Sequence, residues 1–318
     1  MLSKKVVQRV QSLGVPAQVV NTLRVLKQLT QRSPLSNQGS LHIQPVLIIG
    51  SGRSGNTLLR AILVAQGQIA IPPESYVLGA LIHEYQIYNF LPWSLLARLI
   101  ISRFESHPQF IHWSIPLTPV YQQCLALEAD HRTLADAIDV LYQSYATSKQ
   151  VIATRWGDKT PLNTLHLDAI RLVFPNAQYI HMLRDGRDVV QSYIQSGIYQ
   201  EADEAADRWL MSVDNAHRLQ SNLPASQFLE LRYEKLVLEP RHSLEEVCQF
   251  LGISYSQNML EFWKSSENLG DTSLEHHANV RNPINRDSIG KWKTNLSEEI
   301  QARLSQRIGA KLRELEYL

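Results

Sequence analysis

The chain has 318 residues, of which 44% are hydrophobic and 19% are charged, and its formal net charge at pH 7 is +1. This composition is ordinary for a globular protein, and the near-zero charge excludes a global field that would draw the chain to nucleic acid or anionic lipid. The two cysteines, Cys124 and Cys248, exclude a disulfide scaffold, and a cysteine-based metal site is not expected. Any anion site must therefore be built locally, from a few arginines, lysines and backbone N–H groups.

Residues 1–40 are predicted to form an N-terminal helical arm and a linker, and residues 41–318 to form one main domain. Apolar residues between Val6 and Leu26 recur at helical spacing with basic residues between them. A helix packed on the domain and a helix lying on a membrane surface both fit this pattern. No segment has the roughly 20 uninterrupted apolar residues of a membrane span, and no signal-peptide core follows the first lysines, so a cytoplasmic protein is expected.

Strands and helices are predicted to alternate along the main domain. The apolar run Val46–Ile49 is typical of a strand buried on both faces, and a glycine-rich turn and a helix over Thr57–Val64 follow it. The stretch Val77–Ser148 reads as mostly helical, with breaks near Pro92 and over 108–119. The later elements are a strand at Val151–Thr154, a helix at Leu165–Phe174, a strand at Gln178–Leu183, a helix from about Asp188, a helix at Glu201–Gln220, a strand at Phe228–Arg232, a helix at Ser243–Leu251, a polar loop at Ser265–Ile289 and a helix at Leu296–Leu315. This order predicts a P-loop-type, doubly wound, mostly parallel α/β sheet with helical insertions, whose ligands sit at the carboxyl ends of the strands.

The turn after the first predicted strand has the spacing of a phosphate-binding loop. Residues 50–57 read G-S-G-R-S-G-N-T, so Asn56 stands where nucleotide-hydrolysing enzymes have the lysine that reaches the β- and γ-phosphates. The glycines let successive N–H groups point inward, and the following helix presents its positive end to an anion. Arg53 is the natural substitute for the missing lysine. The loop predicts an anion site that is not built for ATP, and a tight turn with nothing bound is the alternative.

A second anion-binding pattern begins where the strand Gln178–Leu183 ends. Arg184 closes that strand, and Ser192 lies eight residues on, in the next helix, where its hydroxyl can converge on the same anion. ATP would not need this second site. Surface ion pairs within the R-D-G-R-D sequence of residues 184–188 are the competing explanation.

Residues 50–58 closely resemble the 5′-phosphosulfate loop of the sulfotransferases, especially of the tyrosylprotein branch, in which the loop reads like G-x-P-R-S-G-T-T-L. In this chain Gly52 replaces the proline and Asn56 replaces one threonine. The resemblance runs from about Pro45 to Trp292. It implies a sulfotransferase that takes a sulfuryl group from 3′-phosphoadenylyl sulfate (PAPS) and releases adenosine 3′,5′-bisphosphate (PAP).

The same resemblance implies which residues bind the nucleotide. Arg184 and Ser192 would bind the 3′-phosphate, which distinguishes PAPS from ATP. Tyr233, in a Y-E-x-L element after the last predicted strand, would lie near the adenine, although a tyrosine there is also a common core residue. Lys291, in a C-terminal loop, would reach back to the 3′-phosphate. The residues implied to bind the 5′-phosphosulfate are Arg53, Ser54, Gly55, Asn56 and Thr57.

Sulfuryl transfer requires a base for the acceptor hydroxyl and cations where charge builds on the leaving oxygen. Glu74 lies 21 residues beyond Arg53, the spacing at which the tyrosylprotein branch has its proposed catalytic glutamate, and is assigned as the base; an exposed loop glutamate is the alternative. Lys159 resembles the family's lysine at the leaving oxygen. No metal is expected, because His276 and His277 lack carboxylate or cysteine partners.

The acceptor is left open by the sequence. Carbohydrate, lipid, small-molecule, tyrosyl and carrier-bound hydroxyls all fit, and a nucleic-acid partner is not expected. A P-loop kinase that uses ATP and Mg²⁺ is the rival enzyme, against which Asn56 and the lack of a clear Mg²⁺-binding aspartate after a strand argue. A non-catalytic protein that binds PAPS or PAP is the rival from another class. The region Val77–Ser148 and the loop Ser265–Ile289 are expected to shape the acceptor pocket.

Overall fold

The computed structural model describes residues 32–151, 153, 155–265, 269–270 and 280–318. Over these residues, five strands form one parallel sheet in the order β2-β3-β1-β4-β5. Because β3 lies on one side of β1 and β4 on the other, the chain changes direction across β1, where ligands of such sheets bind. The strands are β1 (Val46–Ile49), β2 (Ile69–Ala70), β3 (Arg155–Asp158), β4 (Gln178–Leu183) and β5 (Phe228–Arg232).

Helices account for most of the remaining described residues. Short 3₁₀ segments lie between them, among which η4 (Pro161–Leu165) follows β3. The α-helices are α3 (Asn56–Gln66), α4 (Leu78–Tyr88), α5 (Trp93–Glu105), α6 (Leu117–Ala126), α7 (Leu134–Ser148), α8 (Leu167–Val173), α9 (Gly186–Gln195), α10 (Ala202–Gln220), α11 (Tyr233–Leu238), α12 (Pro240–Leu251), α13 (Trp292–Asn295) and α14 (Glu298–Glu314). None of the described helices is both long and apolar enough to cross a membrane.

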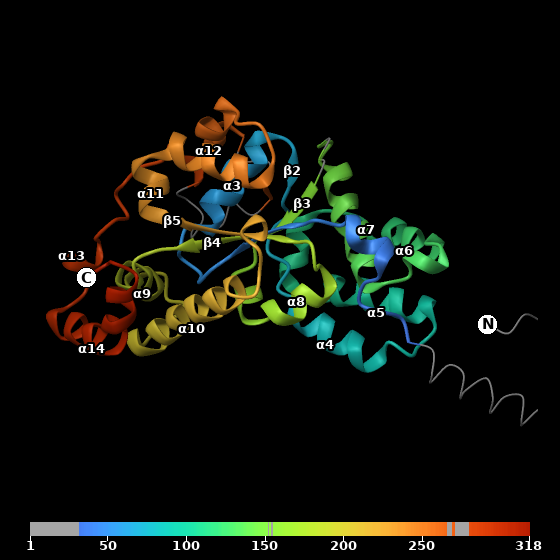
Figure 1. The fold of residues 1–318 in the computed structure, drawn as a ribbon, viewed down its shortest axis with the longest axis horizontal. Coiled ribbons are helices and arrows are strands. Elements are labelled where there is room, and N and C mark those ends of the chain that lie inside the picture. Colours follow the sequence, from blue (N-terminus) through green and yellow to red (C-terminus); the bar gives the residue numbers. More distant parts are fainter. Residues whose placement is uncertain (1–31, 152, 154, 266–268, 271–279) are drawn as a thin grey trace, which may run out of the picture.

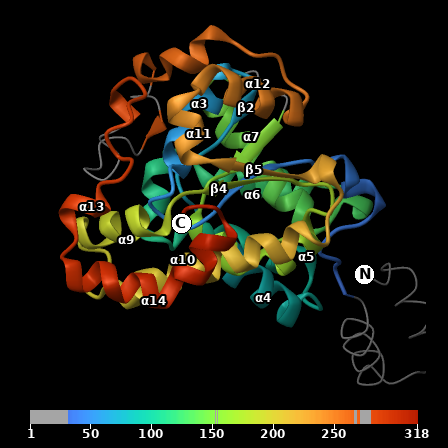
Figure 2. The same cartoon turned by 60° about the vertical axis from the view of Figure 1, so that its left-hand side comes forward.

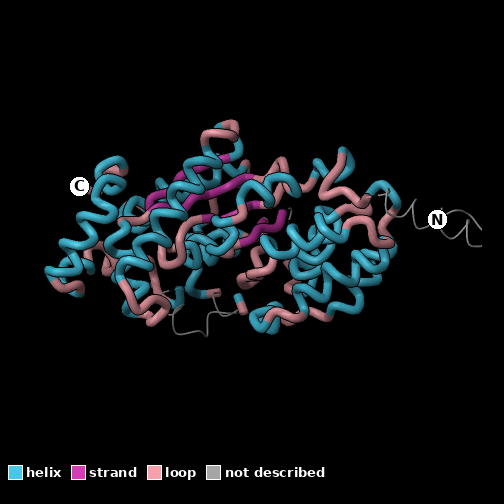
Figure 3. The backbone as a smooth tube through the Cα atoms, turned by 90° about the horizontal axis from the view of Figure 1, so that it is seen from below, coloured by secondary structure: helices cyan, strands magenta, loops and turns pink. Residues whose placement is uncertain are grey.

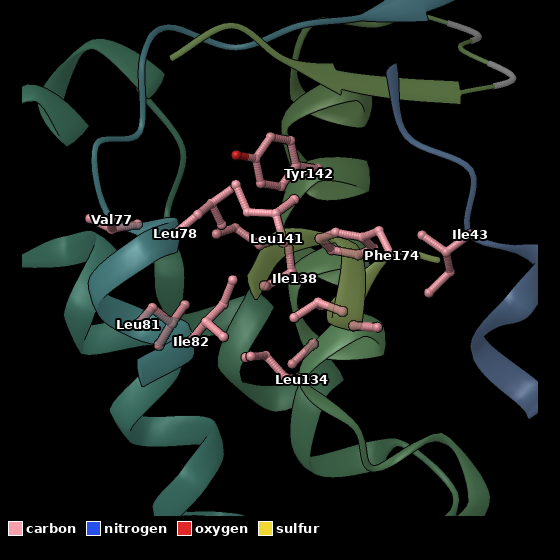
Figure 4. Close-up of a cluster of buried hydrophobic side chains, with 14 of the residues drawn as sticks. Ile43, Val77, Leu78, Leu81, Ile82, Leu134, Ile138, Leu141, Tyr142 and Phe174 are labelled. Carbon is pink, nitrogen blue, oxygen red and sulfur yellow. The ribbon is translucent and has the colours of Figure 1, made fainter. Parts of the chain in front are cut away.

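Alternate residues of β1 face two different cores, as the twofold period of a strand requires. Val46 and Ile48 pack with α3, α11 and α12, whereas Leu47 and Ile49 pack with α4, α5, α7 and α8. The strands therefore run through the middle of the molecule with helices on both sides (Figures 1 and 3). In the core that contains Leu47 and Ile49, side chains of α4 and α7 face each other (Figure 4), among them Leu81, Ile82, Leu134 and Ile138. This is the doubly wound α/β fold that the sequence predicts.

The predicted strand at Val151–Thr154 is wrong by four residues, because the observed β3 is Arg155–Asp158. Its pairing with β1 places Gly157 opposite Val46, and a Cβ on Gly157 would lie 2.6 Å from the carbonyl oxygen of Val46. The strand forms at this polar stretch because its glycine lets the two backbones approach closely. The prediction missed it because it looked for a run of apolar residues. The shift moves Lys159 directly to the carboxyl end of the strand.

The described end of the predicted linker is fastened to the main domain. Backbone hydrogen bonds join Ser33 to Asn89, and Ala135 to Leu35. The hydroxyl of Ser40 is buried and donates to Asp136 over 2.5 Å. Residues 33–40 therefore lie against the end of α4 and the start of α7. The predicted helical arm over residues 1–31 lies outside the described residues.

A polar cluster joins β4, β5 and α10. His181 Nδ1 lies 3.0 Å and His217 Nε2 lies 2.8 Å from the same oxygen of Glu230, Oε2. Burial lowers the pKa of His181. Burial alone would raise the pKa of Glu230, but the hydrogen bonds from the two imidazoles outweigh it and hold that pKa well below its usual range. Within the described part of the chain, this is the one group whose side chains could converge on a metal ion, and none of the three lines the cavity described below.

This cluster predicts that the protein loses stability in acid. The folded state keeps His181 neutral and Glu230 ionised. Below about pH 6.5 the unfolded chain therefore binds more protons than the folded protein, and the free energy of unfolding decreases as the pH is lowered. Melting temperatures measured from about pH 8 to about pH 4 should therefore decline, and Glu230→Gln should flatten the decline below about pH 5. Glu245→Gln, in an exposed pair with Arg241, is the matched control and should keep the wild-type slope. A flat wild-type profile would contradict this account.

Candidate active site

The loop after β1 curls back on itself as the phosphate-loop pattern predicts. Gly50 and Gly55 have φ of +137° and +97°, and Arg53 shares the left-handed region at +66°. A Cβ on Gly55 would lie 2.6 Å from the ring of Tyr233, so this position admits only glycine. Asn56 Nδ2 donates to the carbonyl oxygen of Ser51 over 2.8 Å, which closes the loop from inside. Asn56, at the position of the missing lysine, therefore stabilises the shape of the loop, and its amide nitrogen already has a hydrogen-bond partner.

Lys159 and Glu74, predicted as the charge stabiliser and the base, are in direct contact. Lys159 is fully buried, and its Nζ donates both to Glu74 Oε1 and, over 3.1 Å, to the hydroxyl of Thr57 in the first turn of α3. The Glu74 side chain is 13% exposed. The lysine therefore ties Glu74 to the predicted anion loop.

A buried aspartate holds the two segments that carry this pair. Asp158 accepts hydrogen bonds from Tyr142 Oη (2.6 Å), Asn163 Nδ2 (2.7 Å) and Ser75 Oγ (3.2 Å). Its burial raises its pKa. Because Ser75 follows Glu74 and Asp158 precedes Lys159, the Asp158 carboxylate fixes Glu74 and Lys159 relative to each other. Tyr142, on α7, carries no motif that the sequence could have revealed.

Arg184 connects the two predicted anion sites. At the end of β4, its Nη1 donates to the carbonyl oxygen of Arg53 (2.7 Å) and its Nη2 to that of Ser288 (2.5 Å). Its guanidinium carbon lies 4.5 Å from the ring centroid of Tyr233. The Nε atom is buried and has no partner. From the loop side, Arg53 Nε donates to Ser192 Oγ over 2.9 Å, and burial together with the nearby charge of Arg184 lowers the pKa of Arg53.

The loop that carries Lys291 is fastened to the start of α9 by one carboxylate. Asp188, 1% exposed, accepts from the backbone N–H of Gly290 (2.7 Å) and of Trp292 (3.0 Å), the residues on either side of Lys291. The guanidinium of Arg187 lies 4.0 Å from the ring centroid of Trp292. The R-D-G-R-D sequence therefore does more than form surface pairs, because it anchors this loop.

The C-terminus also returns to this place. Tyr317 Oη donates to Glu234 over 2.9 Å, and Arg187 Nη2 donates to the carbonyl oxygen of Tyr317 over 2.8 Å. The other oxygen of Glu234 accepts the backbone N–H of Asp185. Figure 2 shows the C-terminus beside α9 and near β4. Tyr317 thus braces the segment of the predicted second anion site.

These elements surround one cavity of about 580 Å³. Two predicted site residues do not line this cavity. Ser54 is buried within the loop, with its Oγ 3.1 Å from that of Ser51, and Lys159 is buried behind Glu74 and Thr57. His276 and His277 lie outside the described residues. The wall also contains residues that the sequence did not single out, chiefly Tyr76, Leu162, Tyr193, Ile198, Tyr199 and Arg208. The predicted site residues that line it are Arg53, Gly55, Asn56, Thr57, Glu74, Arg184, Ser192, Tyr233 and Lys291.

Comparison with known proteins gives consistent matches. Residues 45–257 match the sulfotransferase family, a range that contains all five strands but not Lys291. A putative protein-tyrosine sulfotransferase of Caenorhabditis briggsae is 24% identical over 270 residues, which cover 82% of this chain and 85% of that protein. An uncharacterized protein of Aquifex aeolicus is 27% identical over 267 residues, which cover 81% of this chain but only 32% of that protein.

A solved structure supports the fold. The sulfotransferase domain of the olefin synthase of Synechococcus PCC 7002 has 22% sequence identity and a TM-score of 0.59, and the match covers 84% of this chain and 96% of that one. The family match spans more than half of the chain and includes Arg53, Arg184 and the Glu74–Lys159 pair. The chain therefore belongs to the sulfotransferase family, the enzymes that transfer a sulfuryl group from PAPS to a hydroxyl group.

Proposed function

We propose that the cavity binds PAPS and transfers its sulfuryl group to the hydroxyl of an acceptor, with Glu74 as the base and with Arg53 and Lys159 as the stabilising cations. One observation carries the proposal: Arg53 and Arg184, each placed directly after a strand, line a single cavity together with Glu74, whose carboxylate contacts the buried Lys159. Residues 41–318 would form the transfer domain, preceded by an arm at residues 1–40.

The residues present fit a nucleotide with phosphate groups at both ends. Arg184 offers a buried N–H at Nε that has no partner, and an anion would satisfy it. Ser192 and Lys291 line the same cavity. At the loop, backbone N–H groups, Arg53 and the start of α3 would hold the 5′-phosphosulfate.

Three side chains have different roles in the proposed transfer. PAPS, when bound, supplies an activated sulfuryl group on a leaving phosphate oxygen. Glu74, held by its contact with Lys159, would take the proton from an acceptor hydroxyl. Lys159 and Arg53 place two fixed positive charges at the loop, where negative charge collects during an in-line transfer. Burial makes these charges more effective than they would be in water.

Calorimetric titration of the full chain with PAP, beside ATP with Mg²⁺, tests the binding half of the proposal. PAP should bind at micromolar concentration or better and ATP far more weakly, since the loop lacks the lysine for a γ-phosphate. Binding of ATP without binding of PAP would overturn the proposal in favour of a kinase. Transfer of label from PAPS to acceptor alcohols then separates an enzyme from a protein that only binds the nucleotide.

Changing Asp188 to Asn should weaken PAP about tenfold and leave adenosine 5′-phosphosulfate, which lacks the 3′-phosphate, nearly unchanged. The amide keeps one acceptor oxygen where the carboxylate has two, so one of the N–H groups framing Lys291 loses its partner. Calorimetry with both nucleotides gives the ratio. Asp203→Asn, whose partly exposed carboxylate pairs with Arg303, is the control and should leave both affinities as they were. Equal losses for the two nucleotides in Asp188→Asn would mean that the loop does not serve the 3′-phosphate.

A further inference from the structure

Part of the cavity wall is not used by the nucleotide contacts proposed above. Tyr76, Leu162 and Ile198 line it and are 37%, 41% and 54% exposed. Tyr76 lies two residues after Glu74, has a left-handed φ of +57°, and stacks on His107 with 5.3 Å between ring centroids. Large apolar side chains that remain exposed on a cavity wall mark a place where apolar matter binds. They therefore favour an acceptor with an apolar part next to its hydroxyl.

One cation on the same wall has no counter-charge among the residues that the structure describes. Arg208, on α10, lines the cavity and donates from Nη2 to the carbonyl oxygen of Pro161 over 3.0 Å. Its other terminal nitrogen, Nη1, is buried and has no partner. A buried guanidinium N–H that is left unpaired is costly, so the working state of the site should supply an acceptor for it.

Arg208 and Arg184 are fastened to different parts of the chain. Arg208 is held by the carbonyl oxygen of Pro161, two residues beyond Lys159. Arg184 is held by the carbonyl oxygens of Arg53 and Ser288. Because the nucleotide contacts proposed above use Arg53 and Arg184, Arg208 is left for a second ligand.

We propose that the acceptor is an amphiphilic alcohol that carries an acidic group. Its hydroxyl lies at Glu74, its apolar part lies against Tyr76, Leu162 and Ile198, and its carboxylate or phosphate pairs with Arg208. This inference rests on the function proposed above and narrows the acceptor from any hydroxyl compound to this class.

The test uses the full chain saturated with PAP and titrated with ω-hydroxy fatty acids of increasing length, each beside its neutral primary amide. At one or more lengths the acid should bind about tenfold or more tightly than its amide, because a charge-assisted hydrogen bond is lost in the amide. Arg208→Gln should bring that ratio close to one, and Arg208→Lys should keep part of it. Arg218→Gln, on the same helix in an exposed pair with Asp168, is the matched control and should keep the wild-type ratio.

Several outcomes would overturn the inference. Equal binding of acid and amide at every length, or no binding of any acid, rules out an anion subsite. Equal weakening of acids and amides in Arg208→Gln, with a lower melting temperature, would mean that Arg208 only holds the Pro161 turn. Weakening of PAPS but not PAP in that variant would assign Arg208 to the sulfuryl group instead. PAP binding, recorded first, reports separately on the proposed function: with PAP bound and no preference for acids, only this inference fails.

Discussion

Changing Glu74 to Gln should lower the turnover number by about 10²- to 10⁴-fold while the affinity for PAP stays close to that of the wild type. The amide keeps the size of the side chain and its place beside Lys159 but cannot take a proton from the acceptor. Initial rates with labelled PAPS give the loss in turnover, and calorimetry gives the affinity. The effect is expected to be large because Glu74 is the carboxylate of the cavity wall that is held against the predicted catalytic lysine.

The control for this prediction is Glu84→Gln, since Glu84 makes a partly exposed pair with Arg103 on the outside of the fold. That variant should have wild-type turnover and affinity. Wild-type rates in Glu74→Gln would rule out Glu74 as the base. A fall in PAP affinity as large as the fall in turnover would show that the Glu74–Lys159 pair serves to shape the nucleotide site and not the proton transfer.

Changing Arg184 to Gln should weaken PAP by about 10²- to 10³-fold, and adenosine 5′-phosphosulfate far less, because charged hydrogen bonds to a phosphate are lost only where a 3′-phosphate is present. Arg184 also donates to two backbone carbonyl oxygens, so some loss for both nucleotides is expected. The ratio of the two losses, measured by calorimetry, is therefore the informative quantity.

A matched control is Arg171→Gln, since Arg171 is an exposed arginine whose Nη1 reaches the carbonyl oxygen of Asn222. It should leave both nucleotides unaffected. If Arg184→Gln weakens PAP and adenosine 5′-phosphosulfate equally, then Arg184 supports the loop of Arg53 and the 3′-phosphate binds elsewhere. Melting temperatures of the two variants show whether any general loss comes from instability.

The strands that the sequence predicts with correct bounds are rich in large apolar residues. β1 is a continuous apolar run, as expected of a central parallel strand buried on both faces, and β4 and the edge strand β5 combine apolar residues with a few polar ones. β3 and β2 are not of this kind. Gly157 is in β3 because two backbones approach closely there, and the two residues of β2 are too few to show a period. In these two strands tertiary pairing decides the structure, and local pattern is a poor guide.

Most of the motifs from which the site is predicted lie directly after strands. Parallel strands end at one edge of the sheet, so residues placed after different strands, such as Arg53, Lys159 and Arg184, meet without any further information. Tyr142 and Arg208 reach the same region from the bodies of helices. Their neighbours in the sequence give no sign of this, because helical residues that face a core or a cavity follow the same period.

The fastening of the segment after residue 289 to α9 has a consequence for how shortened forms of the protein behave. Gly290, Trp292 and Tyr317 are held by Asp188 and Arg187, two neighbouring residues at the start of α9. A truncated form that stops before Gly290 would keep all five strands and lose these contacts, so under the proposed function it would hold PAP poorly. A domain boundary drawn at the end of the sheet would therefore give a folded protein without the proposed 3′-phosphate site.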